Sequence, residues 1–179
     1  MDLLNKNKKK ALIVVAHKDF RDEEYFITRE ILVSSGISVD TASFDISPAV
    51  GIRGGKVDVD VLISNARADD YDALVLIGGR GISSYLDHAA LNELVRSFVV
   101  AEKLVAAICA APIILARAGV LTGKKATVWH TPDNMAYPEI LSASDAVFVD
   151  EEVVIDGRII TASYPEASNR FAESVVSMI

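Results

Sequence analysis

Short apolar runs alternate along the chain with segments whose apolar residues recur at helical spacing. The first run, residues 11–16, is continuous and rich in β-branched residues, which is typical of a parallel strand buried on both faces. The same reasoning predicts strands at residues 37–44, 73–77, 105–108, 127–130, 147–150, 153–155 and 159–161.

Helices are predicted between several of these strands. The first begins at about Asp22, and Gly36 ends it with a left-handed cap. Its apolar face is expected to comprise Phe26, Ile27, Ile31 and Leu32. Further helices are predicted at residues 89–101, at 168–178, and from Pro112 to Gly119.

Residues 47–65 have a different pattern, because Pro48 and several glycines divide them into short pieces. Residues 56–61 alternate strictly between polar and apolar. We predict a small β-excursion around residues 50–61, forming a hairpin on the edge of the main sheet.

Strands that alternate with amphipathic helices predict an α/β fold with a mainly parallel central sheet and helices on both faces. After a basic tail at residues 1–10, the 179-residue chain is expected to form a single domain over residues 11–179. In such folds binding sites form at the carboxyl ends of the strands.

The composition and net charge argue against several classes of function. A net charge of −7 and a pI near 4.9 argue against a nucleic-acid-binding protein. No stretch has the length and apolarity of a membrane span, and a single cysteine fits a reducing compartment, so we expect a cytoplasmic protein that does not bind membranes. One cysteine and three histidines do not make a structural zinc site, and no metal is expected.

The single cysteine, Cys109, lies where the strand at 105–108 turns into the helix that begins at Pro112. Free amide N–H groups and the positive end of a helix dipole favour the thiolate, which is the reactive form. The alternative is a small buried residue with no chemical role.

Other candidate residues follow neighbouring strands. Gly78 and Gly79 could present N–H groups to an oxyanion together with the N–H of Ala110, or form an ordinary turn. Either Glu23 or Glu24 could be buried beneath the cysteine as a proton shuttle, or both could merely stabilise the start of their helix. His130 could sit beside Cys109 as a base, or be a surface histidine, and His17 is a weaker candidate for the same role.

Glu24, Gly78-Gly79, residues 107–112 (AICAAP) and His130 together closely resemble the DJ-1/PfpI superfamily, from about residue 11 to the end of the chain. The resemblance implies a flavodoxin-like three-layer sandwich in which Cys109 is a nucleophile paired with Glu24. It also implies backbone donors at Gly79 and Ala110 and a histidine, His130, near the cysteine. A homodimer or a larger homo-oligomer is expected.

Several positions depart from the family pattern. Ala110 stands where PfpI-like peptidases have the histidine that serves as a base, which weakens a peptidase assignment. Thr28 replaces a proline of the first helix, and Ser163-Tyr164-Pro165-Glu166 replaces the Ser-Arg-Gly-Pro of DJ-1-like members.

The resemblance predicts an enzyme that acts on reactive carbonyls by glyoxalase or deglycase-type hydrolysis and needs no cofactor. Cys109 would attack the aldehyde, Glu24 would move protons, and His130 would orient water or substrate. One alternative is an intracellular cysteine peptidase or amidase acting on peptides. The other is a non-enzymatic redox sensor or chaperone-like stress protein in which Cys109 is oxidised.

Overall fold

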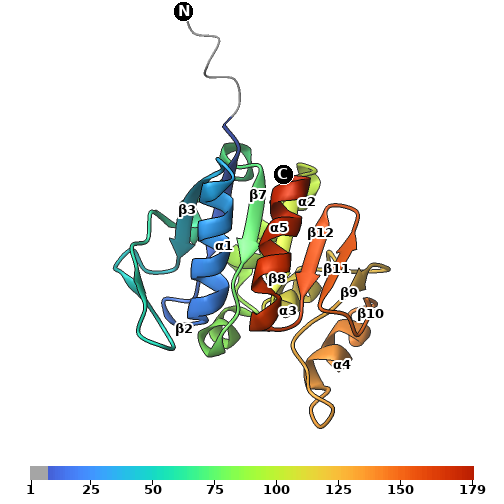
Figure 1. The fold of residues 1–179 in the computed structure, drawn as a ribbon. Helices are drawn as coiled ribbons and strands as arrows, with labels where there is room; N and C mark the ends of the chain where they lie inside the picture. The colour runs from blue at the N-terminus through green and yellow to red at the C-terminus, as the bar shows by residue number, and fades with distance from the viewer. Residues whose placement is uncertain (1–7) are drawn as a thin grey trace, which may run out of the picture.

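The computed structural model describes residues 8–179, so residues 1–7 of the predicted basic tail lie outside the described residues. Seven strands form the central sheet in the order β11-β12-β8-β7-β1-β3-β6, and all neighbours run parallel except β11 and β12 (Figure 1). The predicted fold class is therefore confirmed. The strands are β1 (Lys10–Val14), β3 (Ser38–Ser43), β6 (Val61–Leu62), β7 (Ala73–Leu76), β8 (Leu104–Ile108), β11 (Val153–Asp156) and β12 (Ile159–Ala162).

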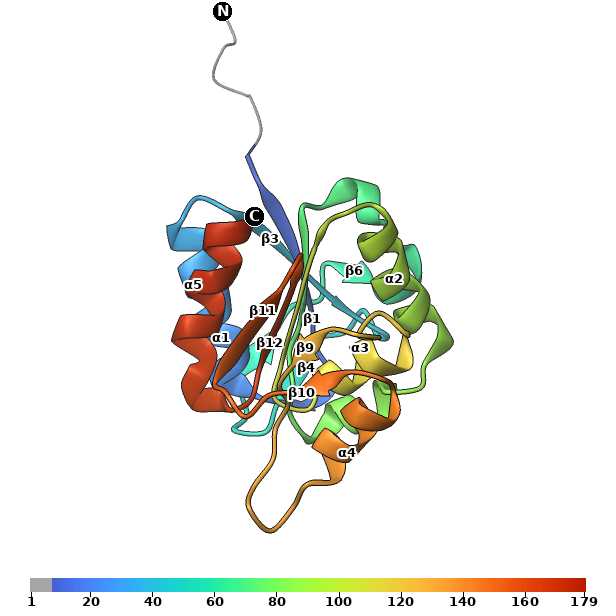
Figure 2. The ribbon, with the colours of Figure 1, turned by 90° about the vertical axis from the view of Figure 1, so that its right-hand side faces the viewer.

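Helices cover both faces of this sheet, which makes a three-layer sandwich (Figure 2). Helices α1 (Asp22–Ser34) and α5 (Ser168–Met178) pack side by side on one face. Helices α2 (Ala89–Val100) and α3 (Pro112–Arg117) lie on the other, with α4 (Ala136–Ala143) beyond α3. Residues 8–179 also contain four short 3₁₀ helices: η1 (Ile63–Asn65), η2 (Ala68–Asp70), η3 (Arg80–Tyr85) and η4 (Pro165–Ala167).

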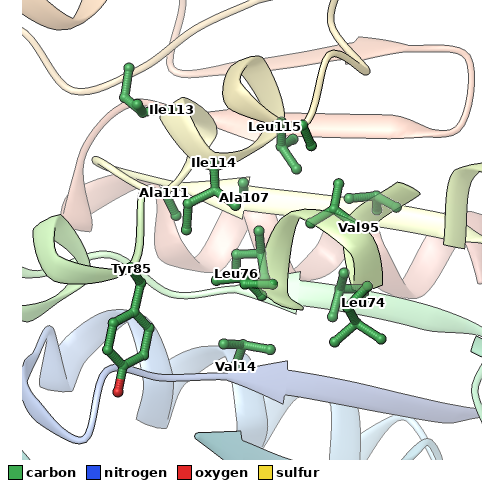
Figure 3. Close-up of a cluster of buried hydrophobic side chains, with 14 of the residues drawn as sticks. Val14, Leu74, Leu76, Tyr85, Val95, Ala107, Ala111, Ile113, Ile114 and Leu115 are labelled. Carbon is green, nitrogen blue, oxygen red and sulfur yellow. The ribbon is translucent and has the colours of Figure 1, made fainter. Parts of the chain in front are cut away.

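Each face of the sheet has its own apolar core, because successive side chains of a strand point to opposite faces. Val14, Leu74 and Leu76 pack toward α2 and α3 (Figure 3), whereas Ile13 and Val75 pack toward α1 and α5. The central strands are buried on both faces, which explains their continuous apolar sequences. No helix within residues 8–179 is long and apolar enough to cross a bilayer.

The predicted β-excursion forms, but away from the edge of the main sheet. Strand β4 (Ala49–Gly51) pairs with β5 (Lys56–Val57) as a hairpin and with β2 (Lys18–Phe20) in a separate three-stranded sheet. The carboxylate of Asp22 accepts the N–H groups of Arg53 and Gly55, each at 2.8 Å, and so pins the hairpin to the start of α1. The main-sheet edge is taken instead by β6.

The predicted inner face of α1 is largely wrong. Of its four predicted residues only Leu32 is buried, and Phe26 is 42% exposed. The helix turns Glu24, Tyr25 and Thr28 inward instead. The Tyr25 hydroxyl forms a 2.7 Å hydrogen bond with the Thr41 hydroxyl, so this polar contact offsets part of the cost of burying polar atoms.

The strand predicted at residues 127–130 is also wrong. A two-residue strand, β9 (Lys125–Ala126), precedes it and pairs only with β10 (Val147–Phe148). Beyond β9 the backbone bonds to other partners, because the Thr127 N–H donates to the Thr161 hydroxyl (2.9 Å) and the Trp129 N–H to the Cys109 carbonyl (2.8 Å). Helix α4 was not predicted, although its Pro138 lies in the first turn, where proline is tolerated.

Candidate active site

Cys109 occupies a strained turn between β8 and α3. Its φ of +63° lies in the left-handed region, which non-glycine residues rarely adopt. Two backbone hydrogen bonds hold the turn: the Cys109 N–H donates to the Ala162 carbonyl (2.9 Å), and the Cys109 carbonyl accepts the Trp129 N–H. The neighbouring strand and the segment after β9 thus fix the cysteine in this conformation.

Glu24 lies beneath the cysteine and is fully buried. One carboxyl oxygen, Oε2, accepts the Gly78 N–H at 2.8 Å. The other, Oε1, has no hydrogen-bond partner among the described residues, and the carboxyl lies beside the Cys109 thiol. Burial raises the pKa of Glu24 from 4.5 to about 7, since desolvation outweighs the stabilising hydrogen bonds. Near neutral pH this carboxyl can therefore either donate or accept a proton.

The Cys109 thiol is held in its protonated form. Burial and the negative charge of Glu24 raise the pKa of this thiol, whereas the Gly79 and Ala110 amides lower it by a smaller amount. This direction differs from the sequence argument, in which the start of the helix favours the thiolate. The arrangement allows a proton to pass from the thiol to the Glu24 carboxylate and does not favour a standing negative charge on the sulfur.

Positions 78 and 79 require glycine, because neighbouring atoms approach the backbone closely at Gly78 and the backbone of Gly79 has a positive φ. A Cβ on Gly78 would lie 2.6 Å from the Cβ of Cys109 and 2.9 Å from Oε2 of Glu24. Gly79 has a φ of +106°, which favours glycine. Its N–H and that of Ala110 lie near the Cys109 sulfur and lower the pKa of the thiol. Two amide donors therefore lie where an oxyanion formed next to the sulfur could be stabilised.

An open cleft of about 510 Å³ adjoins the cysteine. Three aromatic residues, Trp129, Tyr137 and Tyr164, are among those that line it, and the rings of Trp129 and Tyr137 meet edge to face at 6.1 Å. The cleft is lined by Arg21, Ile52, Gly79, Arg80, Cys109, Ala110, Trp129, Thr131, Tyr137, Tyr164, Pro165 and Glu166.

His130 is buried, and its contacts lie behind the cleft surface rather than at Cys109. Nδ1 lies 2.9 Å from the Val128 carbonyl. Nε2 lies 3.1 Å from Oδ1 of Asp150 and 3.2 Å from the Tyr164 hydroxyl. Both ring nitrogens thus already have partners other than the cysteine, and the histidine adjoins the cleft through Tyr164.

The other predicted histidine, His17, is also remote from the thiol. Its ring lies 3.5 Å from the Ser47 hydroxyl and 3.9 Å from Asp45, outside the cleft lining. Across residues 8–179, no three His, Cys, Asp or Glu side chains gather in a group suited to a metal ion.

Sequence reasoning missed the aromatic residues of the cleft. Tyr164 follows the carboxyl end of β12, which adjoins β8, and the sequence marks this segment only as a departure from the family pattern and not as part of a cleft. Trp129 and Tyr137 carry no comparable signal, because the strand that would have placed Trp129 does not form and α4 was not predicted.

The fold and the site together define a class: α/β proteins with a cysteine on a strained strand–helix turn above a buried glutamate. The DJ-1/PfpI family model matches residues 9–178. The chain therefore belongs to the DJ-1/PfpI family.

Individual relatives and a solved structure support the family assignment. An uncharacterized protein of Methanocaldococcus jannaschii is 42% identical over 98% of this chain and 84% of its own length. The glutathione-independent glyoxalase DJR-1.2 of Caenorhabditis elegans is 26% identical over 96% of this chain and 89% of its own. The deglycase PfpI of Pyrococcus furiosus is 30% identical over 86% and 90%. The crystal structure of a ThiJ/PfpI domain protein from Brachyspira murdochii superposes with a TM-score of 0.91 at 32% identity, covering 96% of this chain and 97% of the other.

Proposed function

We propose that this protein is a cofactor-independent enzyme that hydrolyses reactive carbonyl compounds, as a glyoxalase or deglycase does. The observation that carries the proposal is the pairing of a buried carboxyl, whose pKa is about 7, with a thiol on a strained turn. The names of two relatives, a glyoxalase and a deglycase, support the same class of substrate.

With methylglyoxal as substrate, the first step forms a bond between the Cys109 sulfur and the aldehyde carbon. The thiol proton passes to the Glu24 carboxylate, and the carbonyl electrons move to oxygen near the Gly79 and Ala110 amides. Return of the proton to that oxygen gives a neutral hemithioacetal and regenerates the carboxylate.

Glu24 then takes the proton from the former aldehyde carbon and returns it to the adjacent ketone carbon, while the hydroxyl proton passes to the ketone oxygen. This internal redox step oxidises one carbon and reduces its neighbour, so it needs no external oxidant. It yields a thioester of lactate, and water cleaves the C–S bond to release lactate and the thiol. An adduct of the same aldehyde with an amine would enter by expelling that amine.

A peptidase is a weaker proposal. Ala110 replaces the adjacent histidine, and the hydrogen bonds of His130 go to Val128, Asp150 and Tyr164. No general base other than Glu24 contacts the sulfur among the described residues.

The test is lactate formation from methylglyoxal by the wild type and by the Cys109→Ser variant. We expect a rate well above background for the wild type and a loss of at least about 10³-fold for the variant, because serine is a much weaker nucleophile when only a carboxylate activates it. Equal rates, or a wild-type rate at background, would contradict the proposal. A casein-hydrolysis assay of the same proteins tests the peptidase alternative, which predicts hydrolysis by the wild type and none by Cys109→Ser.

A further inference from the structure

We propose that Tyr164 is a substrate-binding residue of the cleft and that His130 determines the direction in which its hydroxyl hydrogen points. This inference rests on the proposed function, because it concerns how the same cleft holds a carbonyl compound. It gives His130 a positioning role that is exerted through Tyr164 rather than on the sulfur.

Tyr164 reaches the cleft because of the order of strands. β12 lies parallel to β8, with Ala162 opposite Ile108, so both chains leave the sheet at the same end. Cys109 follows one strand and Tyr164 lies two residues beyond the other. The bond from the Cys109 N–H to the Ala162 carbonyl, at 2.9 Å, ties these exits together. Tyr164 and Cys109 consequently line one cavity.

The Val128 carbonyl determines that Nδ1 of His130 carries a proton. A carbonyl oxygen can only accept a hydrogen bond, so at 2.9 Å Nδ1 must carry a proton. In the neutral ring Nε2 then has a lone pair and accepts the proton of the Tyr164 hydroxyl, 3.2 Å away. The Phe148 ring meets the imidazole edge to face at 5.2 Å and helps to hold it.

The Asp150 carboxylate and the Tyr164 hydroxyl are alternative hydrogen-bond partners of Nε2 of His130. Its Oδ1 lies 3.1 Å from Nε2, and a carboxylate can accept only if Nε2 also carries a proton. The neutral ring therefore turns the phenol hydrogen away from the substrate and leaves the oxygen free to accept from a substrate hydroxyl. The protonated ring donates to Asp150 and frees the phenol to donate to a substrate carbonyl.

Several charged and titratable groups surround this arrangement, and Arg21, Arg80 and Glu166 line the same cleft as Tyr164. Asp150 and the Tyr164 hydroxyl contact the ring, from the segment after β10 and the segment after β12. Burial raises the pKa of the Tyr164 phenol, and the negative charges of Asp150 and of Glu166, on η4, raise it further. The Tyr164 phenol therefore keeps its proton near neutral pH.

The experiment compares kcat/KM for lactate formation from methylglyoxal in Tyr164→Phe, His130→Asn and the double variant. Asparagine keeps an N–H near the Val128 carbonyl but has no counterpart of Nε2. We expect each single variant to lose about tenfold, the effect of one hydrogen bond. The double variant should also lose about tenfold, since both changes remove the same interaction.

Tyr71→Phe is the matched control. It also removes a hydrogen-bonded hydroxyl, from Tyr71 to Asp40 at 2.8 Å, but Tyr71 precedes β7 and lies at the other end of the sheet. It should retain wild-type kcat/KM. Alkylation of Cys109 by iodoacetamide should proceed at the same rate in the wild type and Tyr164→Phe, because the phenol acts on the substrate and not on the thiol.

A Tyr164→Phe variant as active as the wild type would overturn the inference, and so would a loss of about a hundredfold in the double variant. Absence of lactate formation by the wild type would count against the proposed function instead. The link between the two side chains is then tested by the ring ¹⁵N resonances of His130. The proposal predicts the Nδ1-protonated tautomer and a shift of Nε2 in Tyr164→Phe, and unchanged resonances would contradict it.

Discussion

Two groups of residues share the cleft, and they are held in place by different means. The elbow cluster consists of Glu24, Gly78, Gly79, Cys109 and Ala110. Backbone atoms of the central sheet and its turns position it, and a hypothetical Cβ at Gly78 would lie within 3 Å of two of its members. The aromatic cluster consists of Trp129, Tyr137 and Tyr164. Ring packing, the hydrogen bond between Tyr164 and His130, and one backbone hydrogen bond from Trp129 to the Cys109 carbonyl position it.

The difference indicates a division of roles. Bond-making requires reacting groups to be placed within a fraction of an ångström, which backbone amides and a buried carboxyl of the sheet can provide. Substrate selection tolerates looser placement and suits large side chains on segments outside the sheet. Changes in the elbow cluster should therefore have much larger effects than changes in the aromatic cluster.

Gly78→Ala should have the largest effect among substitutions that leave the reacting groups themselves unchanged. The new methyl group would press on the Cys109 Cβ at 2.6 Å and on the Ile108 carbonyl at 2.9 Å, so the backbone must shift. We expect a loss of about 10²-fold in kcat, because displacement of reacting groups is costly. Overpacking should also lower the free energy of unfolding by about 2 kcal/mol, to be measured by urea denaturation.

Gly119→Ala is the control for this change. Gly119 has a φ of +76° but no atom within 4 Å of a Cβ, so the variant should lose about 1 kcal/mol of stability through backbone strain alone. Its turnover should stay at the wild-type level. If Gly78→Ala also turned over normally, the elbow cluster would not require the close packing described above.

The Glu24→Gln variant tests the elbow cluster through the pH dependence of the free energy of unfolding. Because the pKa of Glu24 is about 7 in the folded protein and 4.5 ordinarily, the folded state prefers the protonated carboxyl. This carboxyl's contribution to stability is full below about pH 4.5 and is lost as the pH rises through 7, a change of roughly 3 kcal/mol. Urea unfolding between about pH 5 and pH 8 should show this fall in the wild type but not in Glu24→Gln. Parallel pH profiles would contradict the buried, protonated carboxyl.

Trp129→Leu should have the smallest effect. A small aldehyde bound at Cys109 contacts few atoms of the indole, so KM for methylglyoxal should rise about threefold with kcat unchanged. Steady-state kinetics give both constants. A large fall in kcat would show that the aromatic cluster takes part in the chemistry and would remove the distinction between the two clusters.

The residues of the elbow cluster are the part of the candidate site that the sequence pattern marks. Buried parallel strands have continuous apolar sequences, and glycine, cysteine and proline at their ends mark the turns where a site forms. The strand ends that carry Gly78 and Cys109 are therefore visible without a structure. The same local pattern could not reveal that Glu24 is fully buried, since the apolar residues of α1 suggested a different inner face.

The aromatic cluster was missed because long-range partners position it. The segment after β9 looked like a strand, yet its amides bond to Thr161 and Cys109 rather than to a ladder. The role of His130 depends on Val128, Asp150 and Tyr164, of which only Val128 is near in sequence. Side-chain hydrogen bonds between distant segments leave no periodic signal.

The most direct test of the central claim is to trap the bond between Cys109 and the substrate. The wild type and the Glu24→Gln and Cys109→Ser variants would be mixed with methylglyoxal, quenched in acid, and measured by intact-mass spectrometry with peptide mapping. Glu24→Gln should accumulate one methylglyoxal adduct on the Cys109 peptide, because the first addition can use a solvent base while the later proton transfers are blocked. Cys109→Ser should show none. Lactate formation by the wild type together with an adduct-free Cys109 in Glu24→Gln, or an equal adduct in Cys109→Ser, would contradict the account.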